Sequence, residues 1–194
     1  MFQADLIASC IKNNKVAKKQ FFDTYFGKTS YVALRYSKNS SQSEHIAMQG
    51  FAHVFSKLNQ FKSQSSLTIN EFIKHEFISF AVNYIKEIRS EYYVASTVKA
   101  IDDPDKTYDL FLDSKFIDVK NVNKDVLIKS LQSLVPSQRM TFNLVVIDNY
   151  SLLQTSEFLD TNEQSIKSTL EKARFNLQKN IETNLKLSNY ESAV

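Results

Sequence analysis

The sequence predicts an all-α protein with two helical domains joined by an acidic linker. Its 194 residues include only two glycines and two prolines, which argues against a sheet built with tight turns and favours long helices. Apolar residues recur at spacings of three and four over most of the chain, as they do along helices that bury one face. This pattern breaks between residues 94 and 125. We therefore expect domains at residues 1–95 and 125–187, with the linker at 96–124.

Four helical segments are expected in the N-terminal domain. They cover residues 3–13, 15–38, 44–58 and 67–93. The second is interrupted at most by Gly27. Each segment has a stripe of apolar side chains, and the longest turns Phe72, Ile73 and Phe77 toward a core. Residues 40–43 are expected to form a polar cap, and residues 59–66 a polar loop.

The linker is recognised by its composition. Residues 94–125 contain seven aspartates and Pro104, with one short apolar cluster that includes Leu110 and Phe111. Such a stretch is typical of a spacer between two folded domains. At most one short helix is expected within it.

The C-terminal domain is predicted to contain a helix-turn-helix. A first helix begins at Pro136 and continues into an apolar run that ends at Ile147. A short helix capped by Ser151 follows, and a turn at residues 160–162 leads to a longer helix capped by Thr161 or Asn162. The side chains available for the buried side of the short helix are Leu152, Leu153, Thr155 and Leu159. The long helix has an apolar stripe of Ile166, Leu170, Ala173 and Leu177.

The other face of the long helix is a candidate DNA-binding surface. It presents Ser165, Lys167, Ser168, Thr169, Lys172 and Arg174. In the major groove, hydroxyls can bond base edges or phosphates, and Lys favours the acceptors of guanine. Lys172 and Arg174 are expected to touch phosphates, which position a protein without specifying a sequence. An ordinary solvated face that alternates Lys with Glu171 accounts for the same residues.

The net charge of +3 is unevenly distributed. Residues 1–100 hold 13 Lys and Arg against 7 Asp and Glu, residues 101–125 hold 4 against 7, and residues 126–194 hold 7 against 7. DNA-binding domains usually carry a basic excess, because phosphate contacts supply most of the affinity. The helix-turn-helix domain is therefore expected to be basic only locally.

The sequence indicates neither a membrane protein nor an enzyme. No apolar run approaches the roughly 20 residues of a membrane span, and the N-terminus lacks the pattern of a signal peptide. The single cysteine, Cys10, suits a reducing cytoplasm, where we expect the protein. The dispersed histidines His45, His53 and His75 predict no metal site, and no glycine-rich phosphate loop is present. We expect no cofactor.

Several spaced residues carry a resemblance to a known family. In the C-terminal half these are Leu131-x-x-Leu-x-Pro-x-x-Arg-x-x-Phe-x-Leu144, then Tyr150-Ser151, then Ile166-Lys-Ser-x-Leu-x-Lys-Ala-Arg-x-x-Leu177. This pattern resembles domain 4 of bacterial RNA polymerase sigma factors of the extracytoplasmic-function (ECF) type. In that family the helix-turn-helix reads the promoter −35 element. The sequence departs from the family at positions where glycine is usual, namely Asn149, Asp160 and Gln164, and at Thr169, where arginine is usual.

The N-terminal half resembles domain 2 of the same family. The matching stretches are Ala33–Tyr36, Ser43–Ile46, Gly50–Phe61, Phe72–Lys74 and Val82–Lys86. The resemblance implies that the helix around Gly50 docks on the polymerase, and that the helix from Phe72 to Lys86 opens and reads the −10 element. The implied polymerase-binding residues are Glu44, Gln49 and His53, although a solvated helix face accounts for them equally well. Glu44 is the one acid kept where the family has several.

The implied −10 candidates are Lys74, His75, Ser79, Asn83, Tyr84 and Lys86. Basic grooves with exposed aromatic rings are suited to single-stranded DNA, because the rings stack on bases. The alternative places Phe80 and Tyr84 in a helical core. In the family the linker between the two domains lies along the RNA exit path, and a plain solvated spacer is an equal alternative.

The resemblance implies an ECF-like sigma factor, which acts by binding and has no covalent chemistry of its own. Its expected partners are core RNA polymerase and promoter DNA, and the family also allows an anti-sigma factor. The alternative is a degenerate sigma-like protein that uses the fold for regulatory protein–protein contacts. The spacing of both domains favours the first hypothesis. The neutral C-terminal domain and the missing acids around Glu44 favour the second.

Overall fold

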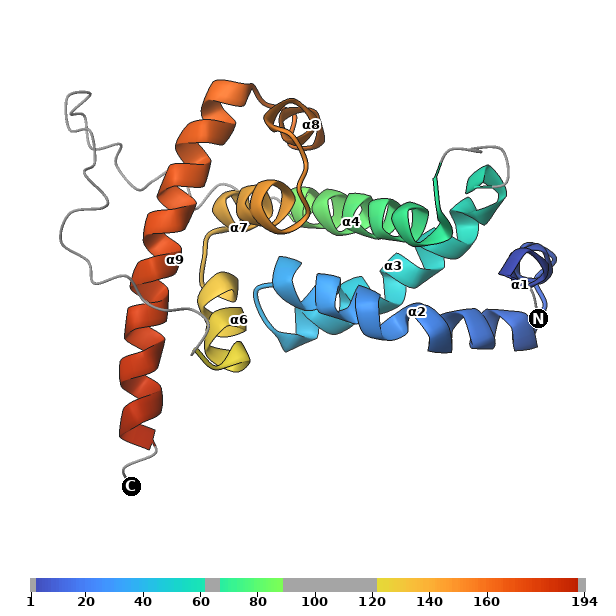
Figure 1. Cartoon of the computed structure of the whole chain (residues 1–194), viewed down its shortest axis with the longest axis horizontal. Coiled ribbons are helices and arrows are strands. Elements are labelled where there is room, and N and C mark those ends of the chain that lie inside the picture. The colour runs from blue at the N-terminus through green and yellow to red at the C-terminus, as the bar shows by residue number, and fades with distance from the viewer. Residues whose placement is uncertain (1–2, 62–66, 89–121, 192–194) are drawn as a thin grey trace. The chain divides into compact units, whose positions relative to one another are not determined.

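The computed structural model describes residues 3–61, 67–88 and 122–191, and in these ranges every regular element is a helix (Figure 1). The all-α fold class is thus confirmed. The chain divides into two compact units, Met1–Glu87 and Ile88–Val194. Most of the predicted linker, residues 96–121, lies outside the described residues, so the linker and the functional division at 96–124 stay predictions.

The first unit is a helical bundle. Its helices are α1 Gln3–Ile11, α2 Lys15–Tyr36, α3 Ser40–Phe61 and α4 Ile69–Glu87. Helices α2, α3 and α4 pack against one another, and α1 packs on α2 and α3. Their shared core includes the fully buried side chains of Phe21, Tyr36, Ile46 and Phe77. This burial follows the apolar stripes of the sequence.

Helix boundaries in the first unit differ from the prediction. Helix α4 begins at Ile69 and ends at Glu87, inside the predicted range 67–93, and α3 differs at both ends. The residues predicted as a polar cap, 40–43, form the first turn of α3, because Asn39 accepts a hydrogen bond from the Gln42 amide at 2.9 Å. The side chain of Gln42 is buried and accepts the Lys38 amide at 2.7 Å. Helix α3 also continues to Phe61, three residues past the predicted end. The polar residues here provide hydrogen-bond partners at the start of the helix and do not mark a loop.

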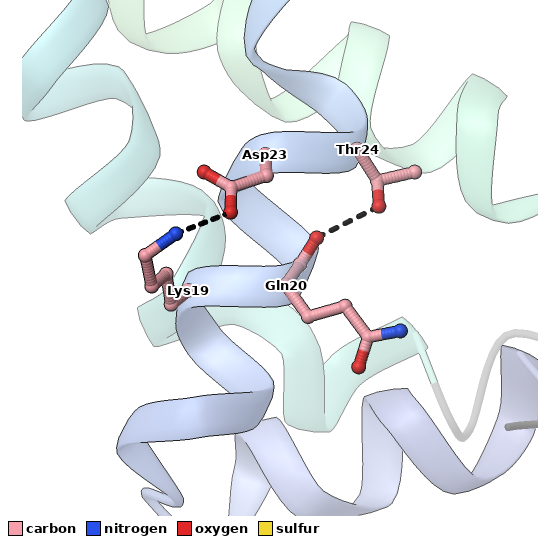
Figure 2. A network of polar contacts seen from close by, with 4 residues as sticks. All are labelled: Lys19, Gln20, Asp23 and Thr24. Carbon is pink, nitrogen blue, oxygen red and sulfur yellow. Dashed lines mark hydrogen bonds and ion pairs between the residues drawn. The ribbon is translucent and has the colours of Figure 1, made fainter.

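Helix α2 is continuous through Gly27 and carries a polar face toward solvent. Its start is capped by Asn14, whose side chain accepts the Ala17 amide at 3.0 Å. On the exposed side, Lys19 and Asp23 form an ion pair at 2.7 Å, and the Thr24 hydroxyl donates to the Gln20 carbonyl at 2.7 Å (Figure 2). Such exposed i,i+4 contacts contribute little to stability, about 0.3–0.5 kcal/mol for the ion pair.

The second unit contains a long helix on which shorter ones pack. Its elements are α6 Lys124–Gln132, α7 Pro136–Phe142, the π-helix η3 Asn143–Ile147, α8 Leu152–Phe158 and α9 Glu163–Glu191. Helices α6, α7 and α8 all contact α9 (Figure 1). Leu131, Leu134 and Ala173 form a buried cluster, with Phe142 and Leu177 packed against it. The helix α6 was not predicted, and α9 extends past residue 187, where the predicted domain ends.

Three asparagines spaced four residues apart attach α9 to its neighbours. The side-chain amide of Asn176 donates to the Gln138 side chain at 2.9 Å. Asn180 donates to the Ser130 carbonyl at 3.1 Å, and Asn184 donates to the Ser130 hydroxyl at 2.9 Å. Together with buried Ile181, the bonds of Asn180 and Asn184 hold the C-terminal half of α9 against α6, while that of Asn176 joins α9 to α7. Polar interhelical contacts of this kind escape a prediction based on apolar periodicity.

Candidate nucleic-acid interface

The helix-turn-helix is formed by α8, a short turn and α9. Ser151 caps α8 as predicted, in a reciprocal pair with Gln154: the Gln154 amide donates to the Ser151 hydroxyl at 3.1 Å, and the Ser151 amide donates to the Gln154 side chain at 2.9 Å. Thr155 and Leu159 are buried and Leu152 is half-buried. Leu153, predicted on the buried side, is 56% exposed, so that assignment was wrong.

Backbone conformation explains two departures from the glycines that are usual in the family that the sequence resembles, one before α8 and one in the turn after it. Asp160 has φ 49° and Asn149 has φ 61°, both in the left-handed region. Asn and Asp are the residues other than glycine that adopt this conformation most readily. After the turn, Asn162 rather than Thr161 caps α9, because its side chain accepts the Ser165 amide at 2.8 Å. Asp160 thus takes the left-handed conformation of the turn without glycine.

Tyr150 fixes the entry to α8. Its ring packs edge-on against Phe158, with centroids 5.1 Å apart. Its amide donates to the Leu144 carbonyl at 2.9 Å. Burial, and secondarily the nearby Asp148 carboxylate, raises the pKa of Tyr150 to about 12. The phenol is therefore neutral at physiological pH, and its ring serves as an anchor for α8.

Thr155 is a buried polar group inside the helix-turn-helix. Its side chain is fully buried, and its hydroxyl has no hydrogen-bond partner in the described part of the chain. We expect Thr155→Val, which keeps the shape and removes the hydroxyl, to raise the free energy of unfolding by about 1 kcal/mol. Urea unfolding followed by circular dichroism measures the change. Thr24→Val on the exposed face of α2 is the control with little expected effect, and a loss of stability in Thr155→Val would contradict the prediction.

The predicted DNA-facing residues of α9 lie on its solvent side. Ser165, Lys167, Ser168, Lys172 and Arg174 are exposed, and Thr169 is half-buried. The predicted stripe is confirmed in Ile166, Leu170 and Ala173, which are buried, while Leu177 is half-buried.

The centre of this outward face holds residues that the sequence prediction missed. At about 100° per residue, Gln164 points about 180° away from buried Ala173, and Ser168 lies one turn further along the same face. Phe175 also lies on this face and is 47% exposed. Lys167 and Arg174 lie on one flank. Counting angles from Ala173 would have found Gln164, but the prediction emphasised hydroxyls and bases.

The predicted −10 residues on α4 do not form one surface. His75, Ser79, Asn83 and Lys86 follow spacings of four, four and three, so they share one face of the helix. Lys74 lies on another side. The Tyr84 ring faces α3, where it stacks on His45 with centroids 4.6 Å apart, and it also stacks on Phe80 at 6.2 Å. Phe80 and Tyr84 are both half-buried, so neither is a core residue or a fully exposed one.

The predicted polymerase-binding residues on α3 also divide. Glu44 and Gln49 are exposed and share the outward face with Met48, which is 59% exposed. His53 instead lies between α3 and α4, with its Nε2 atom 3.0 Å from Glu76 Oε2 and its ring 5.7 Å from that of Phe80. His53 therefore links two helices of the first unit. Among the exposed side chains of α3, whose residues are all described, Glu44 is the one acid.

The described ranges contain neither a metal-binding cluster nor a membrane-spanning helix. No group of three His, Cys, Asp or Glu side chains there is placed to hold a metal ion. None of the helices in those ranges combines the length and apolar character that crossing a membrane requires.

Comparison with known proteins finds a likeness among solved structures. No family model matches the sequence, and no curated protein matches it significantly. Among solved structures, the chain is similar to the sigma factor RpoE of Bartonella quintana, which was solved in complex with the anti-sigma factor NepR. The likeness has a TM-score of 0.54 and 16% sequence identity, and it covers 84% of this chain and 96% of that chain. At this identity it shows the fold: the chain has the helical fold of a sigma factor.

Proposed function

We propose that the protein is a sigma factor, which binds core RNA polymerase and directs it to a promoter. The observation that carries the proposal is the helix-turn-helix of α8 and α9, with five of the six predicted DNA-facing residues exposed, within a fold shared with a sigma factor over most of both chains. The protein would work by binding alone, without a catalytic centre. It would operate in the cytoplasm, where RNA polymerase and DNA are found in bacteria.

In this proposal α9 enters the major groove of the −35 element. The exposed side chains on the first turns of α9 include three positively charged ones, Lys167, Lys172 and Arg174, and two acidic ones, Glu163 and Glu171. The helix is therefore locally basic, although residues 126–194 carry no net charge. The positively charged side chains are suited to contacts with DNA phosphates. The hydroxyls of Ser165 and Ser168 are suited to hydrogen bonds with nucleobase edges or phosphates.

The −10 element would be held on α4 by the stripe of His75, Ser79, Asn83 and Lys86. These side chains offer hydrogen bonds along three turns of one helix face. Tyr84, which stacks on His45, would contribute through that ring pair rather than as an isolated ring. Lys74 would act only by long-range attraction to the DNA.

We expect Lys167→Ala to weaken binding to duplex DNA at low salt several-fold. The slope of the logarithm of the binding constant against the logarithm of salt concentration should become shallower by about 1. The reason is the loss of one phosphate contact. Titration with a labelled random-sequence duplex measures both quantities. Lys129→Ala on α6 makes the same charge change at another exposed position of the unit and serves as the control. Unchanged affinity in Lys167→Ala would show that this part of α9 does not meet DNA.

Transcription reconstituted with core RNA polymerase from the host tests the whole proposal. Co-purification of the polymerase with the protein, followed by transcripts that start at defined sites on host genomic DNA, is the expected result. Failure of the polymerase to co-purify would overturn the sigma-factor proposal.

A second candidate function is a degenerate sigma-like protein that makes regulatory protein–protein contacts. It is favoured by the exposed face of α3, where Glu44 is the one acid, and by the pairing of His53 with Glu76 inside the unit. Binding to polymerase without any promoter-directed transcript would support this candidate. An anti-sigma factor is a proposed partner under either function, since the solved structure that shares the fold has one bound.

A further inference from the structure

Gln164 occupies the most outward position on the first turn of α9. The buried side chains of Ile166, Leu170 and Ala173 define the inward direction, and Gln164 projects about 180° from the last of these. The side chain is exposed, and its amide makes no hydrogen bond within the described part of the chain. The cap of the helix is supplied by Asn162, so Gln164 is not needed to satisfy the helix end.

The chemistry of this side chain matches one base. A primary amide presents an acceptor and a donor side by side. In the major groove, adenine presents the complementary pair, the N7 acceptor and the N6 donor, and Gln or Asn can bond both. Recognition helices of the helix-turn-helix class place their N-terminal residues against base edges. Gln164 is the second residue of α9 and therefore lies at the end of the helix that recognition helices place against base edges.

We propose that Gln164 is a base-reading residue, which pairs its amide with N6 and N7 of an adenine in the major groove. The inference rests on the proposed function, because it requires α9 to bind duplex DNA. Within that function it assigns one specificity-determining contact. Ser168, one turn further along the same face, would contact the neighbouring base or its phosphate, and the flanking Lys167 and Arg174 would hold the backbone.

The proposal predicts an exchange of specificity at one base pair. An ionised Glu side chain accepts hydrogen bonds but cannot donate one. In the major groove, cytosine presents only a donor, its N4 amino group, whereas adenine presents a donor beside an acceptor. Gln164→Glu should therefore exchange a preference for adenine for one for cytosine at a single position. Gln164→Ala should make that position degenerate. A carboxylate near a helix N-terminus is favourable, so Gln164→Glu is expected to fold.

The experiment selects bound duplexes from a random-sequence library with the full chain, with and without core RNA polymerase, and compares the selected motifs. The wild-type motif should contain an adenine, preferred on the order of tenfold over other bases. In Gln164→Glu that position should become cytosine while the other positions stay unchanged. Gln20→Glu, at an exposed position of α2 in the other unit, makes the same charge change and should leave the motif intact (Figure 2).

The outcomes separate this inference from the function on which it rests. An unchanged motif in Gln164→Glu and Gln164→Ala, from a protein that selects a clear motif, would overturn the base-reading role alone. If the wild-type chain selects no motif either with or without polymerase, both the promoter-reading function and the inference fail. Unfolding curves of the two variants, measured beside the wild type, ensure that any change in the motif comes from a folded protein.

Discussion

Replacing Gly50 with alanine is expected to lower the free energy of unfolding of the first unit by about 1–2 kcal/mol. A Cβ atom at this position of α3 would lie 2.6 Å from Cε2 and 2.9 Å from Cζ of Phe77 on α4. The Phe77 ring is fully buried and packs edge-on against Phe51, with centroids 6.0 Å apart. Because these distances are too short for carbon atoms and the ring is fully buried, α3 and α4 must separate or the ring must shift. Such overpacking costs about 1–3 kcal/mol, and the higher helix propensity of alanine offsets up to about 1 kcal/mol.

The other glycine provides the matched control. Gly27 lies in the exposed middle of α2, and a Cβ atom there would meet no atom within 4 Å. Gly27→Ala should therefore raise the stability by about 0.5–1 kcal/mol through helix propensity alone. Urea unfolding of both variants measures the two opposite signs. In the double variant Gly50→Ala, Phe77→Leu, the smaller side chain should make the added methyl less costly, which a double-mutant cycle detects. Equal effects of the two glycine substitutions would contradict this account of the packing.

Replacing Arg139 with leucine is expected to destabilise the second unit by about 2–4 kcal/mol. Arg139 is 1% exposed, and its Nη1 atom donates to the carbonyl of Gln132 at 2.9 Å and to that of Leu134 at 2.6 Å. These carbonyls belong to the end of α6 and the connection to α7. Leucine would fill part of the volume, but it would leave acceptors at the end of α6 without this donor. The connection between the two helices would lose its main polar restraint.

Arg139→Lys separates charge from geometry. Lysine keeps the positive charge, but its ammonium ends a flexible stem of another shape and lacks the rigid, planar arrangement of donors, so it should meet the two carbonyls in a poorer geometry. Its loss of stability should lie between those of the wild type and Arg139→Leu. Urea unfolding followed by circular dichroism measures all three proteins. If Arg139→Leu were as stable as the wild type, the buried guanidinium would have no structural role, and its place in the spaced pattern of the sequence would need another explanation.

The helix-turn-helix was the part of the fold most open to prediction from sequence. Its signals are local: Ser151 as a cap, a three-residue turn, and apolar residues such as Ile166 and Leu170 at helical spacing. The boundaries of α3 were harder to predict from the sequence. Ser40 to Ser43 read as a polar stretch, and only the hydrogen bonds of Asn39 and Gln42 show that the helix already begins there.

The candidate site was predicted in part. Five of the six chosen residues of α9 are exposed, because the exposed face follows directly from the apolar stripe. On α4 and α3 the same reasoning was weaker, because both helices are buried on more than one side. His53, predicted to bind polymerase, pairs with Glu76, and Tyr84, predicted to bind DNA, stacks on His45; both binding roles stay predictions. These contacts join residues far apart in the sequence.

The sequence by itself determined the fold class, the helix-turn-helix and the outward face of α9, since helical periodicity and capping depend on residues within a few positions of one another. Only the tertiary structure decided which polar side chains form hydrogen bonds inside the protein. Arg139, His53 and the three asparagines of α9 look like surface residues in a sequence, yet each bonds to a neighbouring helix. The physical reason is that a polar side chain has the same intrinsic chemistry whether its partner is solvent, DNA or another helix, and only the packing of the helices selects the partner.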